Sequence, residues 1–246
     1  MIAKALSVLT CGTCFLYTSY ILCNLTYFLS NHNENKEAIN PSEIDENIIL
    51  TTLWSLMVNM LLLSAFTLQH SLMASDIVKQ IFFKLNIEYM NRSIYNVASA
   101  ACLHLLLDRW HFMPWMTIWK ADTSSNIWTW YLFTGFHVLA WSIIYSGCLM
   151  MDISELAGLK QVYYKFSARP TPMAMKSREL SRYYSHMRHP SFTGFLIILW
   201  IHPFMTIDRL LLASILTAYM AIMWTIDQED YNYHASLVRR KQRELF

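Results

Sequence analysis

Long stretches without a charged residue constrain the fold of this chain more than any other feature of its sequence. Residues 5–33 and 48–69 carry no Lys, Arg, Asp or Glu, and each run exceeds the roughly 20 apolar residues that span a bilayer. Only 15% of the 246 residues are charged, against about 25% in soluble domains. We therefore predict an all-α, polytopic integral membrane protein.

About six transmembrane helices account for the apolar runs, in a single multi-pass domain over residues 1–246. The predicted spans are residues 5–29, 48–70, 93–108, 127–150, 190–207 and 210–226. A cleaved signal peptide is the weaker alternative at the N-terminus, because its apolar core has only about 7–15 residues. The apolar run of the third span, residues 93–107, covers only about 22 Å, so we expect Arg92 and Arg109 at its ends to snorkel.

Two further segments are predicted to form short amphipathic helices at the membrane interface. Residues 75–92 place apolar side chains at helical spacing among charged ones. The tail, residues 227–246, opens with acidic residues and ends with basic ones. The last two spans should form a hairpin that is joined at Asp208-Arg209.

The charges of the connecting loops predict the orientation of the chain. Residues 31–47 hold five acidic residues against one lysine, whereas residues 152–189 hold seven basic residues against three acidic ones. Six spans place the N-terminus, the basic loop and the basic tail on one side of the membrane. The positive-inside rule assigns that side to the cytosol or nucleoplasm.

Tryptophans gather in the connection that follows the third span. The five are Trp110, Trp115, Trp119, Trp128 and Trp130. Indole rings favour headgroup depth, so we predict an aromatic belt at the membrane face. A surface that stacks nucleic acid would need interleaved basic residues, and only Arg109 and Lys120 are near. We therefore expect no nucleic-acid binding.

Cysteine usage and repeats argue against two other classes of function. The five cysteines all lie within apolar runs, and no second pair accompanies Cys11 and Cys14 to complete a metal site. We therefore expect no metal. The predicted spans show no inverted repeat and no matching pair of helices broken by Gly or Pro, which disfavours a transporter.

The boundary at residues 188–194 holds the strongest pattern for chemistry. Arg188 and His189 close the basic loop, and Pro190 opens an apolar run, where proline suits the first turn of a helix. A helix N-terminus favours an anion such as a carboxylate. Arg188-His189-Pro190, with Gly194 four residues later, resembles the cofactor-binding signature of the membrane methyltransferase superfamily, which includes the isoprenylcysteine carboxyl methyltransferases.

This resemblance implies an enzyme that uses S-adenosylmethionine to methylate a small or lipid-linked thiol or carboxylate. Arg188, His189, Pro190 and Gly194 would then bind the cofactor, and Glu229 would accept from its amine or ribose. The arginine that precedes the superfamily's Glu pair has no counterpart, because residues 223–226 are Met, Trp, Thr and Ile. The alternative is a purely structural network of Arg188, His189 and Glu229, since buried charges must be paired.

Two histidines are candidates for the substrate side of such an enzyme. His70 lies at the end of the second span, and His137 is the deepest histidine of the fourth span. An ionisable group inside the membrane faces protein or a cavity. A neutral histidine bonded to a neighbouring helix is the competing interpretation for His137, and an interfacial side chain for His70.

Several separate stretches carry a second resemblance. They are Gln69–Ala74, Arg92–Tyr95, Gly158–Tyr164 and Asp208–Ala213. Each is similar to the corresponding stretch of the nurim family of multi-pass membrane proteins. The resemblance implies the inner nuclear membrane, tight retention in the envelope, and a structural or interaction role with no established reaction.

The two resemblances lead to different cofactors and partners. A nurim-like protein is expected to need no cofactor, and its partners would be the lipid bilayer and proteins of the nuclear envelope or lamina. The methyltransferase alternative would require S-adenosylmethionine. The sequence carries no nuclear address of its own, because Arg239-Arg240-Lys241 is too short for a localisation signal.

Overall fold

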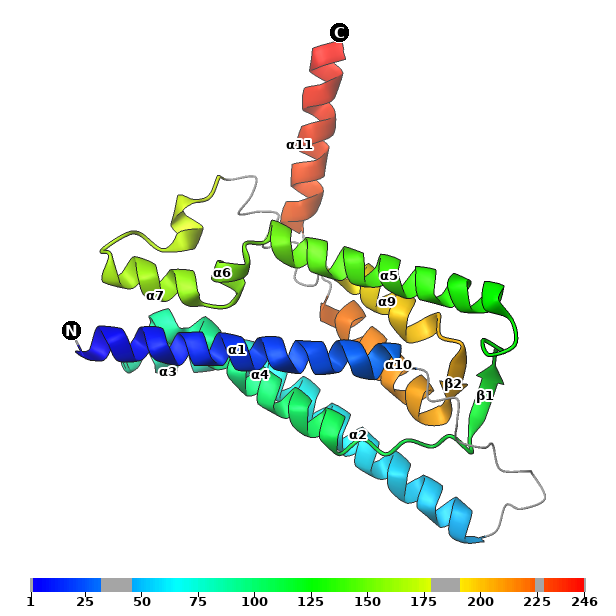
Figure 1. Ribbon diagram of the computed structural model, residues 1–246. Helices are drawn as coiled ribbons and strands as arrows, with labels where there is room; N and C mark the ends of the chain where they lie inside the picture. Colours follow the sequence, from blue (N-terminus) through cyan, green and yellow to red (C-terminus); the bar gives the residue numbers. More distant parts are fainter. Residues whose placement is uncertain (1, 32–45, 178–190, 224–227, 246) are drawn as a thin grey trace.

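The computed structural model describes residues 2–31, 46–177, 191–223 and 228–245, which are mostly helical (Figure 1). The main helices are α1 (Ile2–Ser30), α2 (Glu46–Ala74), α4 (Asn91–Asp108), α5 (Ile127–Met150), α9 (Phe192–Trp200), α10 (Ile207–Met223) and α11 (Gln228–Leu245). Shorter elements are α3 (Asp76–Lys84), α6 (Ile153–Leu156), α7 (Leu159–Phe166), the 3₁₀ helices η2 (Glu88–Met90) and η3 (Pro172–Met175), and the strands β1 (Thr117–Lys120) and β2 (Phe204–Thr206). The predicted all-α class is confirmed.

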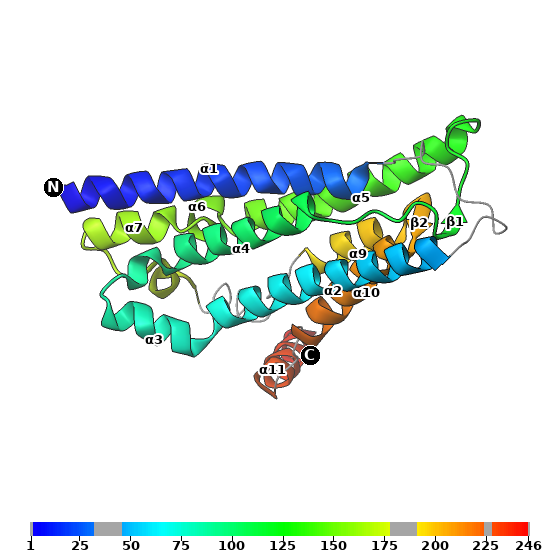
Figure 2. The same cartoon turned by 90° about the horizontal axis from the view of Figure 1, so that it is seen from below.

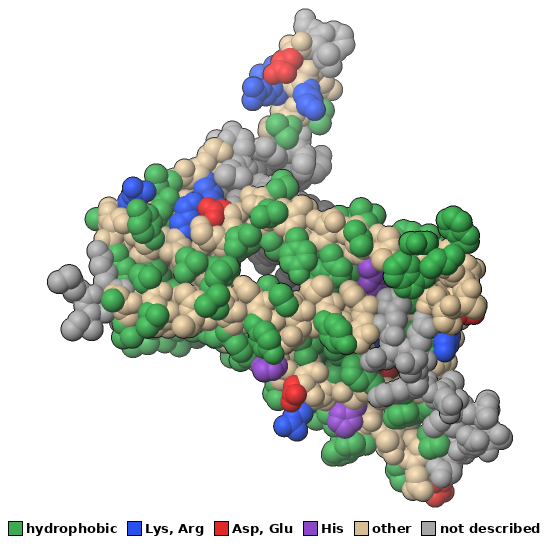
Figure 3. Space-filling view, in the orientation of Figure 1, with side chains coloured by type: hydrophobic (Ala, Val, Ile, Leu, Met, Phe, Trp, Pro, Cys, Tyr) green, Lys and Arg blue, Asp and Glu red, His purple; other side chains and the backbone are tan. Residues whose placement is uncertain are grey.

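Three helices are long and apolar enough to cross a membrane. They are residues Ala5–Ser30 of α1, the whole of α2 and the whole of α5. Much of their apolar surface is exposed, as at Leu9, Leu68 and Leu149, and Figure 3 shows apolar side chains along the outer faces. Apolar patches of this extent are unfavourable in water and match lipid. The prediction of an integral membrane protein is confirmed, while the number of six spans stays a prediction.

The hairpin expected after residue 190 differs from its prediction. Helix α9 has only nine residues, about 13 Å, and residues 204–206 form strand β2 instead of continuing the predicted span to 207. Pro203 disfavours a helical conformation at the residue before it, so the helix ends at Trp200. Asp208 and Arg209 are not the turn, because both lie in the first turn of α10.

A two-stranded antiparallel sheet joins this turn to the Trp-rich connection. Strand β1 pairs with β2, with Thr117 opposite Thr206 and Lys120 opposite Phe204. The backbone N–H of Ile207 extends the contact by donating to the carbonyl of Met116 at 2.9 Å. No sequence pattern predicted these strands. They hold the start of α10 against residues that follow α4.

The short described elements gather at two ends of the bundle (Figure 2). Helices α3, α6 and α7 lie near the N-terminal part of α1, and we call this the α7 end. Strands β1 and β2 lie near the opposite end of α1, which we call the sheet end. The predicted interfacial segment 75–92 comprises α3, η2 and the first residues of α4. The predicted tail helix is present as α11, and its position at the membrane stays a prediction.

The α7 end is tied to α4 by close backbone contacts. The hydroxyl of Ser93 donates to the carbonyl of Ala157 at 3.1 Å, and the side-chain amide of Asn96 donates to the carbonyl of Leu156 at 2.7 Å. Gly158 has φ +86°, and a Cβ there would lie 2.3 Å from the Ser93 hydroxyl oxygen. Only glycine satisfies both the left-handed backbone and this approach.

The core depends on the same kind of close approach between α5 and α9. Gly194 is buried, and a Cβ there would lie 2.6 Å from Cγ1 of Ile144 and 2.7 Å from the carbonyl oxygen of Ala140. The two helices therefore pack with almost no space at this point. Ile144 also belongs to the main buried cluster, together with Ile198 of α9.

We expect Gly194→Ala to destabilise the protein by about 1–3 kcal/mol, because the added methyl group would overpack the contact between α5 and α9. Gly135→Ala on α5 is the matched control, since nothing lies within 4 Å of a Cβ at that position and alanine favours a helix over glycine. Thermal unfolding in detergent measures both. Equal melting temperatures for the two variants would contradict the packing.

Candidate functional site

The residues of the cofactor-like signature are only partly described by the structure. Arg188, His189 and Pro190 lie outside the described residues, as does the side chain of Glu229. Gly194 is described, and it faces α5, where Ile144 and the carbonyl of Ala140 leave no space for a side chain. Helix packing by itself requires a glycine at this position. The cofactor role of these residues stays a prediction.

His70 lies where three helices meet. The hydroxyl of Tyr95 on α4 is 2.6 Å from Nε2 of His70 and 3.1 Å from Nδ1, and the hydroxyl of Ser99 is 3.4 Å from Nδ1. The ring of Tyr219 on α10 meets the imidazole edge at a centroid distance of 6.1 Å. The neighbouring Ser71 hydroxyl is 3.0 Å from that of Tyr219. These five side chains form what we call the His70 cluster.

The His70 cluster is suited to joining helices. Inside a membrane, a side-chain hydrogen bond between helices favours their association, because lipid offers no alternative partner. The imidazole is directed at Tyr95 and Ser99 on α4, which limits its use as a base for another molecule. The two amide atoms of Gln69, next to His70, are buried without a hydrogen-bond partner among the described residues.

His137 is buried and lies within hydrogen-bonding distance of two other parts of the chain. This agrees with the competing interpretation, a histidine bonded to a neighbouring helix. Its Nε2 lies 3.2 Å from the carbonyl of Ile201, to which it can only donate, and Nδ1 lies 3.5 Å from the hydroxyl of Ser30. The same hydroxyl accepts from the indole N–H of Trp141 at 2.8 Å. His137 thus satisfies a carbonyl at the C-terminal end of α9 and joins α1, α5 and α9.

The structure does not bring the two candidate histidines into one site. His70 contacts α4 and α10, whereas His137 contacts the end of α1 and the residue that follows α9. No group of three His, Cys, Asp or Glu side chains within the described residues could hold a metal ion. The two histidines that the methyltransferase resemblance singles out are therefore separate in the described structure.

The basic segment after α5 is partly neutralised by its own acidic residues. Lys176 lies 2.8 Å from Glu155, and both side chains are buried. Lys160 lies 2.7 Å from Asp152, which also accepts from the backbone N–H of Ser154 at the start of α6. Fewer cations than the sequence contains are therefore available to a headgroup or to a carboxylate ligand.

A site that no sequence pattern identified lies at the sheet end. Asp208 is 2% exposed, and its carboxylate accepts from the indole N–H of Trp110 at 3.1 Å and from the backbone N–H of Met113 at 3.2 Å. Arg209 donates to the carbonyl of Leu29 at 2.8 Å. Both residues line a cavity of about 570 Å³ between α1, α4 and α10. Two adjacent charges before an apolar run were its only signal in the sequence.

The candidate histidines do not line the cavity, although the ring of His137 lies 5.6 Å from that of His202, which does. Among the residues that line the cavity are His104 of α4 and His202 of the turn after α9, but neither His70 nor His137. His202 closes that turn, because its Nδ1 lies 2.8 Å from the carbonyl of Phe204. The cavity therefore belongs to α1, α4 and the folded turn. Of the two candidate histidines, only His137 approaches it, through its contact with His202.

The Asp152–Lys160 pair predicts an acid-dependent loss of stability at the α7 end. The hydrogen bond that Asp152 accepts from Lys160, and to a smaller extent the one from Ser154, lower the pKa of the Asp152 carboxyl to about 2. Because this pKa is lower in the folded than in the unfolded chain, the stabilisation is complete above about pH 4 and is lost as the pH falls toward 2. We expect Lys160→Met to reduce this acid-dependent loss, as measured by thermal unfolding between pH 6 and pH 2. Lys84→Met, at an exposed lysine of α3, should leave it unchanged, and an identical profile for Lys160→Met and wild type would contradict the pair.

Known proteins that resemble this chain cover most of its length. A protein of Drosophila pseudoobscura called nurim homolog is 38% identical over 246 residues, which are 99% of this chain and 97% of that protein. The nurim homolog of Drosophila melanogaster is 36% identical over 247 residues, or 99% and 98% of the two chains. Human nurim is 37% identical over 199 residues, or 80% of this chain and 74% of nurim.

No family model and no solved structure matches the chain. The resemblance to the nurim family is therefore supported by similarity over most of the chain and not by a short motif alone. Identity of this extent, over nearly the full length of two of these relatives, shows common descent and a shared architecture. The chain belongs to the nurim family.

Proposed function

We propose that the protein is a structural or interaction component of the inner nuclear membrane, without an enzymatic reaction of its own. Membership of the nurim family supports the location, because the nurim-like stretches of the sequence imply it. The single observation that supports a structural role is the set of contacts that the two candidate histidines, His70 and His137, make. Both are engaged in contacts between helices, and they lie in separate clusters.

We further propose that both termini face the nucleoplasm or cytosol. Helices α3 and α7 lie at the end of the bundle where the chain begins (Figure 2). Exposed basic residues of these elements and of the residues just after α7 include Lys79, Lys84 and Arg169. Cytoplasmic loops carry an excess of Lys and Arg, which supports this orientation. The acidic loop expected on the opposite side falls mainly on residues 32–45, outside the described residues.

The partners that fit this proposal are the lipid bilayer and proteins of the nuclear envelope or lamina. The exposed apolar faces of α1, α2 and α5 offer surface to lipid. The α11 helix carries exposed Arg239, Arg240 and Lys241, a basic surface that fits an acidic partner on the nucleoplasmic side. We expect neither a nucleic acid nor a metal as a partner.

Cell fractionation tests the location, and engineered glycosylation sites test the orientation. We expect the full-length protein to stay with the nuclear envelope after extraction with high salt and non-ionic detergent. A glycosylation acceptor site engineered near Ser42 should be used, because the lumen holds the glycosylating enzyme, whereas one near Ser177 should not. Ready extraction, or a vesicular or plasma-membrane distribution, would contradict the location. The reverse glycosylation pattern would contradict the orientation.

Ligand binding separates the structural proposal from the methyltransferase alternative. A ligand that binds the folded state raises the melting temperature in proportion to the logarithm of its concentration over Kd. We expect millimolar S-adenosylhomocysteine to leave the melting temperature of the purified protein unchanged, and Arg188→Ala to behave like wild type. A clear increase that Arg188→Ala removes would instead support a methyltransferase, since a charge-assisted bond to the cofactor carboxylate is worth about tenfold to a hundredfold in affinity.

A further inference from the structure

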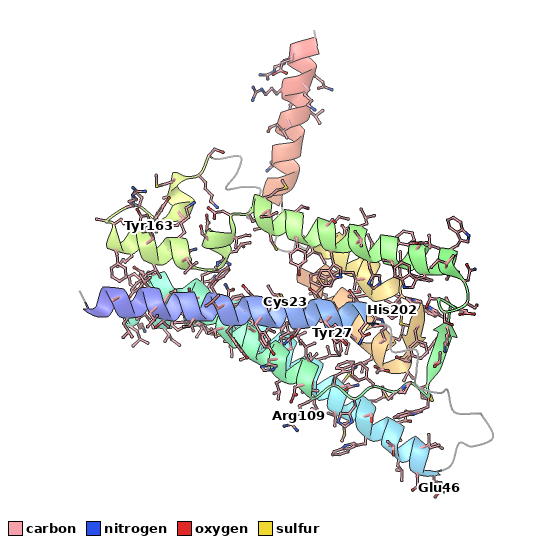
Figure 4. All side chains as sticks on the ribbon, viewed as in Figure 1. Cys23, Tyr27, Glu46, Arg109, Tyr163 and His202 are labelled. Carbon is pink, nitrogen blue, oxygen red and sulfur yellow. The ribbon has the colours of Figure 1, made fainter. Side chains whose placement is uncertain are left out.

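The cavity at the sheet end has the dimensions of a ligand site. Its volume of about 570 Å³ lies within the roughly 300–1,000 Å³ that is typical of small-molecule pockets. Helix α1 forms one wall, α4 and the residues after it form another, and the turn after α9 with the start of α10 closes the third. Figure 4 labels two lining residues, Tyr27 and His202, which lie near the C-terminal half of α1.

The cavity is lined by Arg209, a cation whose guanidinium donors are not all hydrogen-bonded within the described residues. Its Nη2 donates to the carbonyl of Leu29 at 2.8 Å and approaches that of Ile198 at 3.4 Å, while its Nε is buried with no hydrogen-bond partner among the described residues. The carboxylate of Asp208 is already engaged by Trp110 and Met113. The guanidinium also lines the cavity, so an oxyanion bound there would lie beside this cation.

The outer part of the cavity is aromatic and open. Tyr20 and Tyr27 of α1 are 57% and 71% exposed, and Phe112 after α4 is 45% exposed. Aromatic side chains of this kind settle at the depth of lipid headgroups. Asn24 lines the cavity between the two tyrosines, and no described residue forms a hydrogen bond with its side chain. The site thus combines a polar interior with a rim suited to acyl chains.

We propose that the cavity binds the headgroup of a phospholipid, with the phosphate accepting from Arg209 and the acyl chains lying along the exposed side of α1. Arginine is the side chain best matched to phosphate, because its planar fork presents paired donors. The side-chain amide of Asn24 is a second donor within the cavity. Asp108 also lines the site but is paired with Arg109 at 3.1 Å, so it offers little repulsion.

Native mass spectrometry of the delipidated full-length protein tests this assignment. The added probes are palmitoyl-oleoyl-phosphatidylcholine, the diacylglycerol with the same acyl chains, and inorganic phosphate. We expect the phospholipid to bind and the other two to bind at least tenfold more weakly, because only the phospholipid supplies both the phosphate and the chains. Arg209→Met should weaken phospholipid binding by about tenfold to a hundredfold.

Two further variants make the outcome decisive. Arg239→Met on α11 is the matched control, because Arg239 is exposed and does not line the cavity, and it should bind like wild type. Asn24→Phe fills the cavity without removing a hydrogen bond between described residues, so it should lose binding even if Arg209→Met fails to fold. Unchanged binding by Asn24→Phe would overturn the proposal. Equal binding of inorganic phosphate would overturn the lipid in favour of a soluble anion, and equal binding of diacylglycerol would show that Arg209 has no part.

Discussion

The buried carboxylate of Asp208 is the interaction on which the sheet end depends. A carboxylate out of water is stable only when its oxygens are paired, and the indole of Trp110 and the backbone N–H of Met113 supply the donors. Both donors lie on the connection that follows α4, so this connection must fold back against the start of α10. The next residue, Arg209, reaches the last turn of α1 through the carbonyl of Leu29. Two consecutive residues thereby tie three helices together.

The stretches that resemble the nurim family coincide with such joints. Gly158 faces Ser93, in a left-handed conformation that leaves no room for a side chain. His70 binds Tyr95 across two helices, and Asp208 holds the sheet end. Each stretch carries residues that join separate elements of the fold, through close packing at Gly158 and through polar contacts at His70 and Asp208. The nurim-like stretches thus contribute contacts that hold the described elements together.

Charge is also organised internally. The segment after α5 is strongly basic in sequence, yet Lys160 and Lys176 are paired with Asp152 and Glu155, and Lys165 lies 3.6 Å from Glu88 of η2. The buried pair of Glu155 and Lys176 resists replacement of either partner alone, because the remaining charge would be uncompensated. The folded α7 end therefore presents less positive charge to its surroundings than the sequence contains.

The sequence by itself determined the class of protein and the approximate positions of its long helices, because the apolar runs of α1, α2 and α5 exceed a bilayer's thickness and leave few other folds open. It did not determine the short α9, the pairing of β1 with β2, or the setting of Asp208 and Arg209 inside α10. The strand pairing and the setting of Asp208 depend on contacts between residues far apart in the sequence, whereas hydropathy reports only on neighbours. The end of α9 follows from Pro203, whose effect on the apolar run the hydropathy does not show. The packing of the helices likewise decided which residues His70 and His137 contact and where the cavity forms.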